Sequence, residues 1–135
     1  MTSLSPRAVP STCWDEDLRA VLRGLLTTIG DKWSLAVVSV LVDGPVRFTE
    51  IQRRVNGISH RLLTKTLRDL ERDGLVSRTV HAEVPPRVEY ALTPMGESLL
   101  RPIDALVQWV EEHGPIVLAN RAVHGARSAA GDPSR

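Results

Sequence analysis

The chain has 135 residues, of which 42% are hydrophobic, and its formal net charge is +1. No apolar run approaches the roughly 20 residues that a membrane-spanning helix needs, and no secretory signal is visible. The single cysteine, Cys13, excludes an internal disulfide framework, which favours a reducing, cytoplasmic setting. We therefore expect one soluble domain without a membrane segment.

The small net charge conceals an uneven distribution along the chain. Residues 47–78 hold eight Lys and Arg against four Asp and Glu, whereas residues 79–113 hold two against six. Such a concentration of positive charge is typical of a nucleic-acid-binding face. Aromatic residues make up only 4% of the chain, which argues against a single-strand binder built on base stacking.

The first part of the chain predicts a flexible arm and two helices. Residues 1–13 carry Ser, Thr and Pro without an apolar period, as in a flexible arm. From Asp15 to Thr28, apolar residues recur at helical spacing behind acids that suit a helix start. A second helix is expected from about Asp31 to Val42, and because it is apolar on nearly all sides it should form the buried centre.

The next segment predicts a helix-turn-helix. A short helix from about Thr49 to Val55 ends at Asn56-Gly57, and a tight turn leads into a helix over residues 59–73. Ser59 can cap the start of that helix, and Gly74 can adopt the left-handed conformation after its end. In a helix-turn-helix, the second helix typically enters the major groove of DNA.

A change to alternating residues after Gly74 predicts a two-stranded wing. The first strand covers residues 75–82, and Val88, Tyr90 and Leu92 alternate with polar or small residues in the second. Pro85-Pro86 marks the tip of the hairpin, because proline cannot support a strand ladder.

The last long helix is expected to open at Thr93-Pro94 and to end at Gly114-Pro115. The main domain is therefore predicted to span residues 14–113. Residues 114–135 are expected to form an extension that is partly disordered, with at most a short helical turn over residues 116–124.

The helix over residues 59–73 carries the main functional signal. At about 100° per residue, its cations fall on one line opposite its leucines, with Asp69 and Glu71 beside the line and not on it. We define the basic line as Arg61, Lys65, Arg68 and Arg72. A solvated salt-bridge face is the alternative interpretation of any charged helix.

Candidate DNA-contacting residues lie on this helix, before it and in the wing. Arg can bridge the two acceptors of guanine, whereas Lys more often holds phosphate. Arg72 suits a phosphate or an intradomain partner, and Arg47 and Arg87 suit the DNA backbone or minor groove. The predicted set is Arg47, Ser59, His60, Arg61, Thr64, Lys65, Arg68, Arg72 and Arg87.

Six segments in order resemble one family. They are IGDKW at 29–33, RFTEI at 47–51, GIS followed by LL at 57–63, LRDLERDGLVSR at 67–78, VPPRVEYALTPMG at 84–96 and the later Trp109. Together they closely resemble the HxlR-type family of bacterial winged-helix transcription regulators, over about residues 20–112. The resemblance implies a homodimer on a palindromic operator, with residues 59–73 as recognition helix and residues 75–93 as wing. It also implies an interface built from the first and last long helices, here Leu18, Leu22, Leu25, Leu99, Ile103, Leu106 and Val110.

The cysteine departs from this family pattern. Several members are similar in carrying a redox-sensing cysteine about ten residues before the IG pair, where this chain has Ala20. Cys13 lies seven residues further from that pair. Redox control by the usual geometry is therefore not expected, which leaves a small-molecule effector or none.

Other residues give weaker signals. Trp33 and Trp109 suit core packing, and a pocket in which a planar effector stacks on them stays open. The histidines at 60, 81, 113 and 124 lack paired ligand spacing, so neither a metal nor another cofactor is expected. No catalytic motif is present, which argues against a small enzyme.

The sequence thus predicts an α+β winged helix-turn-helix with N- and C-terminal dimerisation helices. The predicted function is sequence-specific binding to double-stranded DNA as a transcriptional regulator, with repression favoured. The alternative is a winged-helix module for protein assembly without specific DNA binding. Such a module would more often expose apolar anchors where this chain has the basic line.

Overall fold

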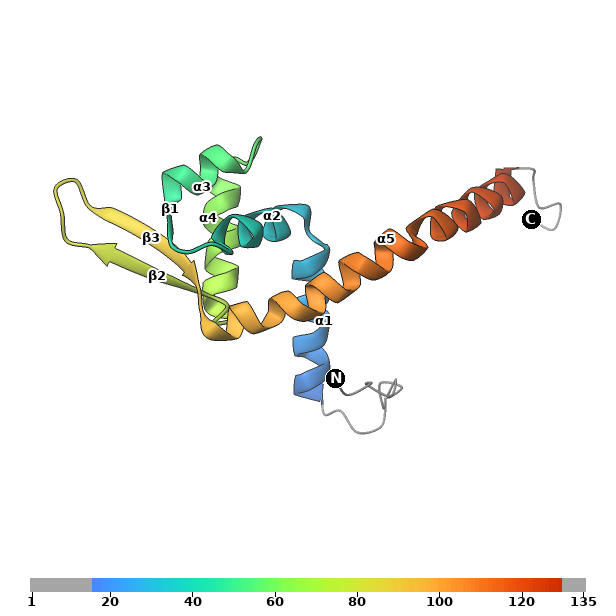
Figure 1. Ribbon diagram of the computed structural model, residues 1–135, viewed down its shortest axis with the longest axis horizontal. Helices are drawn as coiled ribbons and strands as arrows, with labels where there is room; N and C mark the ends of the chain where they lie inside the picture. Colours follow the sequence, from blue (N-terminus) through green and yellow to red (C-terminus); the bar gives the residue numbers. More distant parts are fainter. Residues whose placement is uncertain (1–15, 130–135) are drawn as a thin grey trace. The chain divides into compact units, whose positions relative to one another are not determined.

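The computed structural model describes residues 16–129 and confirms the α+β winged-helix class. It divides into two compact units, one up to Thr93 and one from Pro94. The first unit contains α1 (Glu16–Gly30), α2 (Lys32–Leu41), β1 (Val46–Arg47), α3 (Phe48–Arg54), α4 (His60–Arg72), β2 (Val76–His81) and β3 (Arg87–Leu92), and the second contains α5 (Pro94–Ala129) (Figure 1). The predicted arm at residues 1–13, with Cys13, lies outside the described residues.

The core of the first unit lies among α2, α3, α4 and the start of β2. Its most completely buried side chains are aliphatic, as expected for elements that each bury one face. They are Val37, Leu41, Ile51, Leu63, Leu67, Leu70 and Val76. The prediction of a buried central helix is confirmed for one face of α2, whereas Lys32 and Ser39 on that helix are exposed.

Asp31 separates the first two helices by capping the second. Its carboxylate accepts hydrogen bonds from the backbone N–H and the hydroxyl of Ser34, at 3.3 and 3.0 Å. No single helix among residues 16–129 is both long and apolar enough to cross a membrane. Helices α1 and α2 meet the length and hydropathy criteria only as a pair, and that pair is bent by 82°.

The predicted helix-turn-helix is confirmed, with local bonds that fix the position of α4. Gly57 takes a left-handed φ of 89° in the turn. Ser59 is the N-cap, because its hydroxyl oxygen accepts a hydrogen bond from the Leu62 N–H at 3.1 Å. At the other end Gly74 has φ 77°, and the Leu75 N–H bonds to the Leu70 carbonyl at 3.0 Å.

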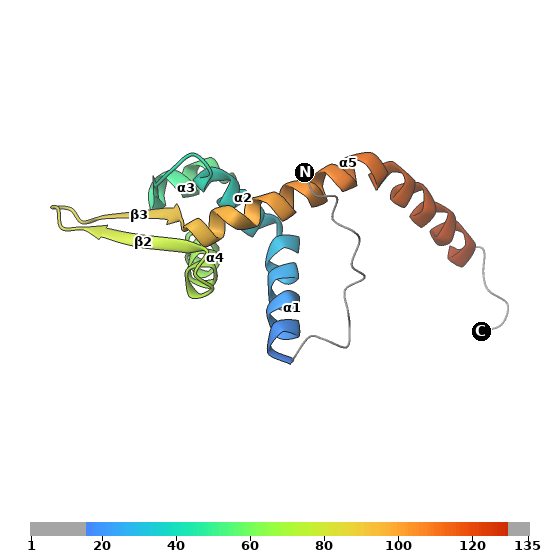
Figure 2. The same ribbon diagram turned by 60° about the horizontal axis from the view of Figure 1, so that its bottom comes forward.

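The predicted wing is present as an antiparallel β2–β3 ribbon that extends from the helices (Figures 1 and 2). Its register pairs Val76 with Leu92 and His81 with Arg87, so Pro85-Pro86 lies in the connecting tip. Strand β1 was not predicted from the sequence; its two residues pair with β3 to give the order β1-β3-β2. A two-residue strand is too short to show an alternating pattern.

The predicted end of the last helix at Gly114-Pro115 is wrong. Helix α5 begins at Pro94 as expected but continues for 36 residues to Ala129, with Pro102 and Pro115 inside it. An interior proline removes only one backbone hydrogen bond, and residues 116–129 include four alanines, two arginines and a leucine, which favour helix. The predicted disorder is therefore also wrong for residues 125–129.

Candidate nucleic-acid interface

Helix α4 separates its apolar and basic faces as predicted. Leu63, Leu67 and Leu70 are fully buried in the core. The basic line is exposed on the other side, with the Lys65 and Arg72 side chains 71% and 72% accessible. No large hydrophobic side chain of α4 is exposed, so this face lacks the apolar anchors of an assembly module.

Asp69, which was predicted to lie beside the basic line, forms ion pairs with two of its cations. Its carboxylate is 2.9 Å from Lys65 Nζ and 3.6 Å from Arg72 Nη1. Among the described residues, Arg61 and Arg68 form no ion pair and make no side-chain hydrogen bond. The α4 surface thus offers two unpaired guanidiniums and two cations that share one carboxylate.

Side chains of α4 also shape an open depression along the helix. It has a volume of about 480 Å³ and is lined by His60, Arg61, Thr64, Lys65, Arg68 and Asp69. The Thr64 hydroxyl donates to the His60 carbonyl at 2.8 Å, which leaves its oxygen lone pairs available to an incoming donor. Five of the nine predicted DNA-contacting residues therefore come together on one surface.

The two predicted arginines outside α4 differ in their ion pairs and in their exposure. Arg47 precedes α3, is exposed and forms no ion pair within residues 16–129. Arg87 is held by Glu83 at 3.2 Å and Glu89 at 3.6 Å, and only 28% of its side chain is exposed. The buried Arg87 Nε has no hydrogen-bond partner in the part of the chain that the structure describes. Contact between Arg87 and DNA would therefore require exchange of its carboxylate partners.

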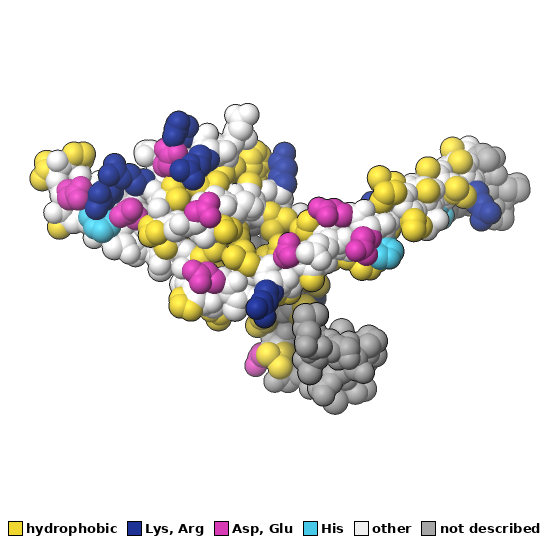
Figure 3. All heavy atoms as spheres, viewed as in Figure 1, with side chains coloured by type: hydrophobic (Ala, Val, Ile, Leu, Met, Phe, Trp, Pro, Cys, Tyr) yellow, Lys and Arg dark blue, Asp and Glu magenta, His cyan; other side chains and the backbone are white. Residues whose placement is uncertain are grey.

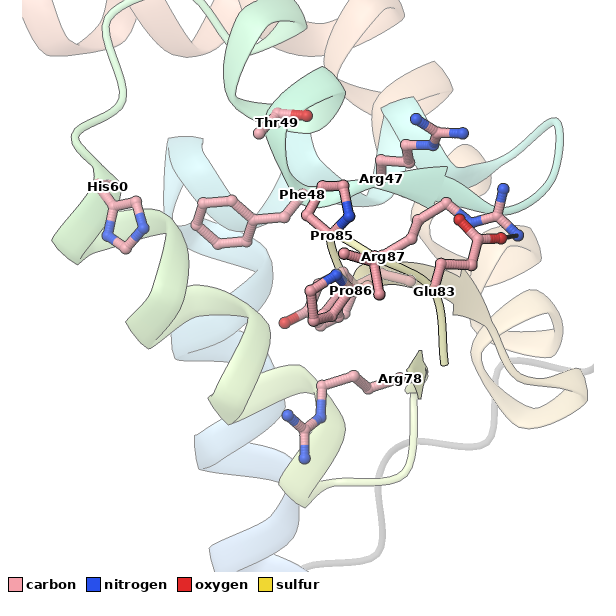
Figure 4. Close-up of a pocket in the computed structure, with 12 residues that line it drawn as sticks. Arg47, Phe48, Thr49, His60, Arg78, Glu83, Pro85, Pro86 and Arg87 are labelled. Carbon is pink, nitrogen blue, oxygen red and sulfur yellow. Dashed lines mark ion pairs between the residues drawn. The ribbon is translucent and has the colours of Figure 1, made fainter. Parts of the chain in front are cut away.

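A second hollow, of about 490 Å³, lies where α3, the start of α4 and the wing meet. The Phe48 ring lies near His60, with centroids 4.8 Å apart (Figure 4), and its centroid is 6.4 Å from that of Tyr90. Burial raises the pKa of Tyr90, against smaller lowering effects of Arg78 and Arg68. Neither this hollow nor the position of Arg78 in its lining was predicted, because the alternation of residues in the wing strands does not show which side chains face α4.

Basic side chains over α3 and the wing lie next to acidic ones (Figure 3). On α3, Glu50 accepts hydrogen bonds from Arg53 and Arg54. The bond from Arg53, followed by that from Arg54, lowers the pKa of Glu50. These two arginines are therefore partly neutralised, unlike Arg61 and Arg68 on α4.

The residues predicted at the dimer interface are at most half-buried in a single chain. Leu18 on α1 and Leu106 and Val110 on α5 are 54%, 48% and 50% exposed. The other four, Leu22, Leu25, Leu99 and Ile103, are half-buried. Each helix thus carries apolar side chains that the single chain leaves accessible to water.

Trp33 and Trp109 belong to different units. Trp33 is half-buried with its ring beside Gly57, where an added Cβ would lie 3.6 Å from Trp33 Cη2, and Lys32 Nζ lies 4.6 Å from the ring centroid. Trp109 is 50% exposed and stacks on His113 with centroids 4.6 Å apart. Within residues 16–129, no group of three or more His, Cys, Asp or Glu side chains could hold a metal ion.

Comparisons with known proteins agree on one family. A family model described as HxlR-like helix-turn-helix matches residues 28–117. The chain is 45% identical over 100 residues to an HTH-type transcriptional regulator of Methanothermobacter thermautotrophicus, covering 74% of this chain and 76% of the relative.

Solved structures show the same similarity. A transcriptional regulator assigned to the MarR family from Enterococcus faecalis is 37% identical, with a TM-score of 0.66, and covers 82% of this chain and 98% of its own. The redox regulator HypR in its reduced form is 36% identical, with a TM-score of 0.64 over 73% of this chain and 98% of its own.

Proposed function

Because the chain belongs to the HxlR-like helix-turn-helix family of DNA-binding transcriptional regulators, we propose that it is a homodimeric repressor that binds an inverted-repeat operator. The observation that carries the proposal is the exposed basic line on a helix whose opposite face is buried and whose N-terminus is capped by Ser59. This arrangement is that of a recognition helix in the major groove.

The roles of the α4 residues follow from their partners. Arg61 and Arg68, which have no ion pair within the described residues, are proposed to read base edges, because a guanidinium can bridge the O6 and N7 acceptors of guanine. Lys65 and Arg72 are proposed to contact phosphates, which displace Asp69. Ser59, His60 and Thr64 lie at the N-terminal end, where polar side chains reach bases or backbone.

Outside α4, Arg47 is proposed to hold the DNA backbone. It is exposed and has no acidic partner among residues 16–129. Arg87 is proposed to contribute less, because binding a phosphate would break its pairs with Glu83 and Glu89.

The dimer is proposed to form through the apolar faces of α1 and α5. Their predicted interface residues, among them the exposed Leu18, Leu106 and Val110, are favourable to bury, and a twofold dimer would present two copies of α4. Two adjacent major grooves on one side of DNA are about 34 Å apart, so the half-sites should be separated by about one helical turn.

The experiment measures DNA binding by α4 variants at several salt concentrations. Arg61→Ala and Arg68→Ala should each lose about 1–3 kcal/mol at the operator and relax base preference. Lys65→Ala should weaken binding to all sequences alike and reduce the salt slope by about one. The control is Arg121→Ala on α5, which removes the same charge. Unchanged affinity in all three α4 variants would remove the recognition-helix assignment.

A further inference from the structure

The hollow between the wing and the helix-turn-helix has the size of a ligand pocket. Its volume of about 490 Å³ lies within the range of about 300–1,000 Å³ that is usual for small-molecule sites. Its walls come from five elements, β1, α3, α4, β2 and β3, and from the wing tip. The lining includes Phe48, His60, Arg78, Pro85, Pro86 and Tyr90.

The aromatic side chains give this pocket a surface suited to a flat ring. The Phe48 ring contacts those of His60 and Tyr90, with the ring planes tilted by 54° and 52°. Pro85 and Pro86 of the wing tip also line the pocket (Figure 4). Aromatic rings favour tilted or offset packing at such separations, so a planar ligand gains contact here that a small inorganic ion would not.

The charge of the lining is positive. Three arginines line the pocket, against the single carboxylate of Glu83, which is paired with Arg87. Arg78 pairs with Glu71 on α4, with Arg78 Nε 3.7 Å from the carboxylate, but its guanidinium makes no hydrogen bond among the described residues, so a ligand carboxylate would compete only with this long ion pair. A guanidinium can bind a carboxylate through two parallel hydrogen bonds.

We propose that this pocket binds a small aromatic carboxylate, with its ring against Phe48, His60 and Tyr90 and its carboxylate on Arg78. Tyr90, which also lines the pocket, adds a hydroxyl donor. The ligand is expected to be a planar acid of one or two rings.

Binding at this site bears on DNA recognition through His60. This residue lines both the ligand pocket and the depression along α4, and it is the first residue of the recognition helix. A ligand ring packed on His60, with added negative charge beside α4, opposes the approach of phosphates. The ligand is therefore an effector that weakens DNA binding. This effector role rests on the proposed function.

Calorimetric titration of the full chain without DNA tests the site. The probe is 2-naphthoate, compared with its neutral isostere 2-naphthamide and with inorganic phosphate. Arg78→Gln should weaken 2-naphthoate binding by about tenfold or more, as should the change to the amide, because a charge-assisted hydrogen bond is lost. Arg121→Gln is the charge-matched control and should bind as wild type.

Circular dichroism and thermal unfolding establish that Arg78→Gln is folded. Equal binding of 2-naphthoate and 2-naphthamide, or of wild type and folded Arg78→Gln, would overturn the carboxylate assignment. Equal binding of phosphate and 2-naphthoate would show that the aromatic lining has no role and would overturn the proposed ligand class.

A second measurement follows release of labelled duplex DNA by 2-naphthoate, using fluorescence anisotropy. Wild type should release DNA at ligand concentrations that occupy the site. Arg78→Gln should need about tenfold more ligand for the same fractional release, where release is measured against the DNA binding of each protein without ligand. Ligand binding without release would overturn the effector role. Absence of DNA binding before ligand is added would contradict the proposed function, and the calorimetric result would still decide the site.

Discussion

The ammonium group of Lys65 lies 2.9 Å from Asp69 Oδ2, one turn further along the recognition helix. The same carboxylate lies 3.6 Å from Arg72, so one acid serves two cations of the basic line. Exposed ion pairs of this kind contribute only about 0.2–1 kcal/mol, so phosphates can displace the acid at small cost. Asp69 therefore holds Lys65 and Arg72 in place without DNA and moderates their attraction to any duplex.

Replacing Asp69 with Asn should strengthen binding to nonspecific DNA and steepen its salt dependence by about one unit of slope. The variant frees Lys65, leaves Arg72 with only its pair to Asp73 at 3.6 Å, and removes a negative charge close to the phosphates. Anisotropy titrations with a random duplex at several salt concentrations measure both effects. Glu112→Gln on α5 removes one charge elsewhere and controls for the change in net charge. Identical salt slopes in Asp69→Asn and wild type would contradict this role of Asp69.

Ser59→Ala should lower the free energy of unfolding by about 1 kcal/mol, because the Leu62 N–H loses its side-chain acceptor. Ser59→Asp keeps an acceptor and should retain stability, but its charge should weaken DNA binding. Urea unfolding and anisotropy titrations separate the two effects. Ser98→Ala on α5 removes a hydroxyl that donates to the Met95 carbonyl and caps no helix start. A Ser98→Ala loss as large as that of Ser59→Ala would refute the capping argument.

Helix α4 was predictable because local signals agree. Ser59 predicts the start of α4, its leucines predict the buried face and Gly74 predicts the end, and the structure confirms each of these. The ion pairs of Asp69 were not predictable. Angular position on a helix does not show that a carboxylate four residues after a lysine will bend toward it, although that spacing permits contact.

The far half of α5 and the wing pocket were beyond sequence reasoning for different reasons. A Gly-Pro pair such as Gly114-Pro115 usually ends a helix. Here α5 continues through it to Ala129, and the residues that follow show no local signal strong enough to predict this. The contact of Phe48 with His60 and Tyr90 depends on how β1 pairs with β3, and β1 is too short to recognise. Tertiary placement, and not local pattern, brings these three rings together.

The stability provided by Glu50 should depend on pH. Hydrogen bonds from Arg53 and then Arg54 lower its pKa from the ordinary value of 4.5, so its contribution is present above that value and is lost as pH falls through the lowered pKa. Wild type should be more stable than Glu50→Gln at pH 7, and the difference should vanish in acid. Urea unfolding from pH 7 to pH 3 measures this, with Glu112→Gln as control. A difference that stays constant over this range would exclude the mechanism.

Cys13 should not be an obligatory redox switch. Its neighbours Asp15, Glu16 and Asp17 are acids, whereas a reactive thiolate needs nearby cations, and the family's sensing position holds Ala20. Because the redox regulator HypR has a similar fold, redox control through Cys13 should be tested directly. Operator binding by wild type and Cys13→Ser should respond equally to mild peroxide. Release of wild type alone would show that Cys13 controls binding.

Leu106→Glu should convert the proposed dimer to monomer. Leu106 is 48% exposed in the single chain, and an interface over it could not accept a buried carboxylate without a partner. Leu118→Glu is the matched control, because Leu118 lies on the same helix, is 65% exposed and belongs to no predicted interface. Sedimentation equilibrium gives the mass of each variant, and circular dichroism verifies folding. Since a monomer presents one α4, Leu106→Glu should also lose preference for an inverted repeat over a single half-site. A dimeric Leu106→Glu, or a monomeric wild type at micromolar concentration, would exclude this interface.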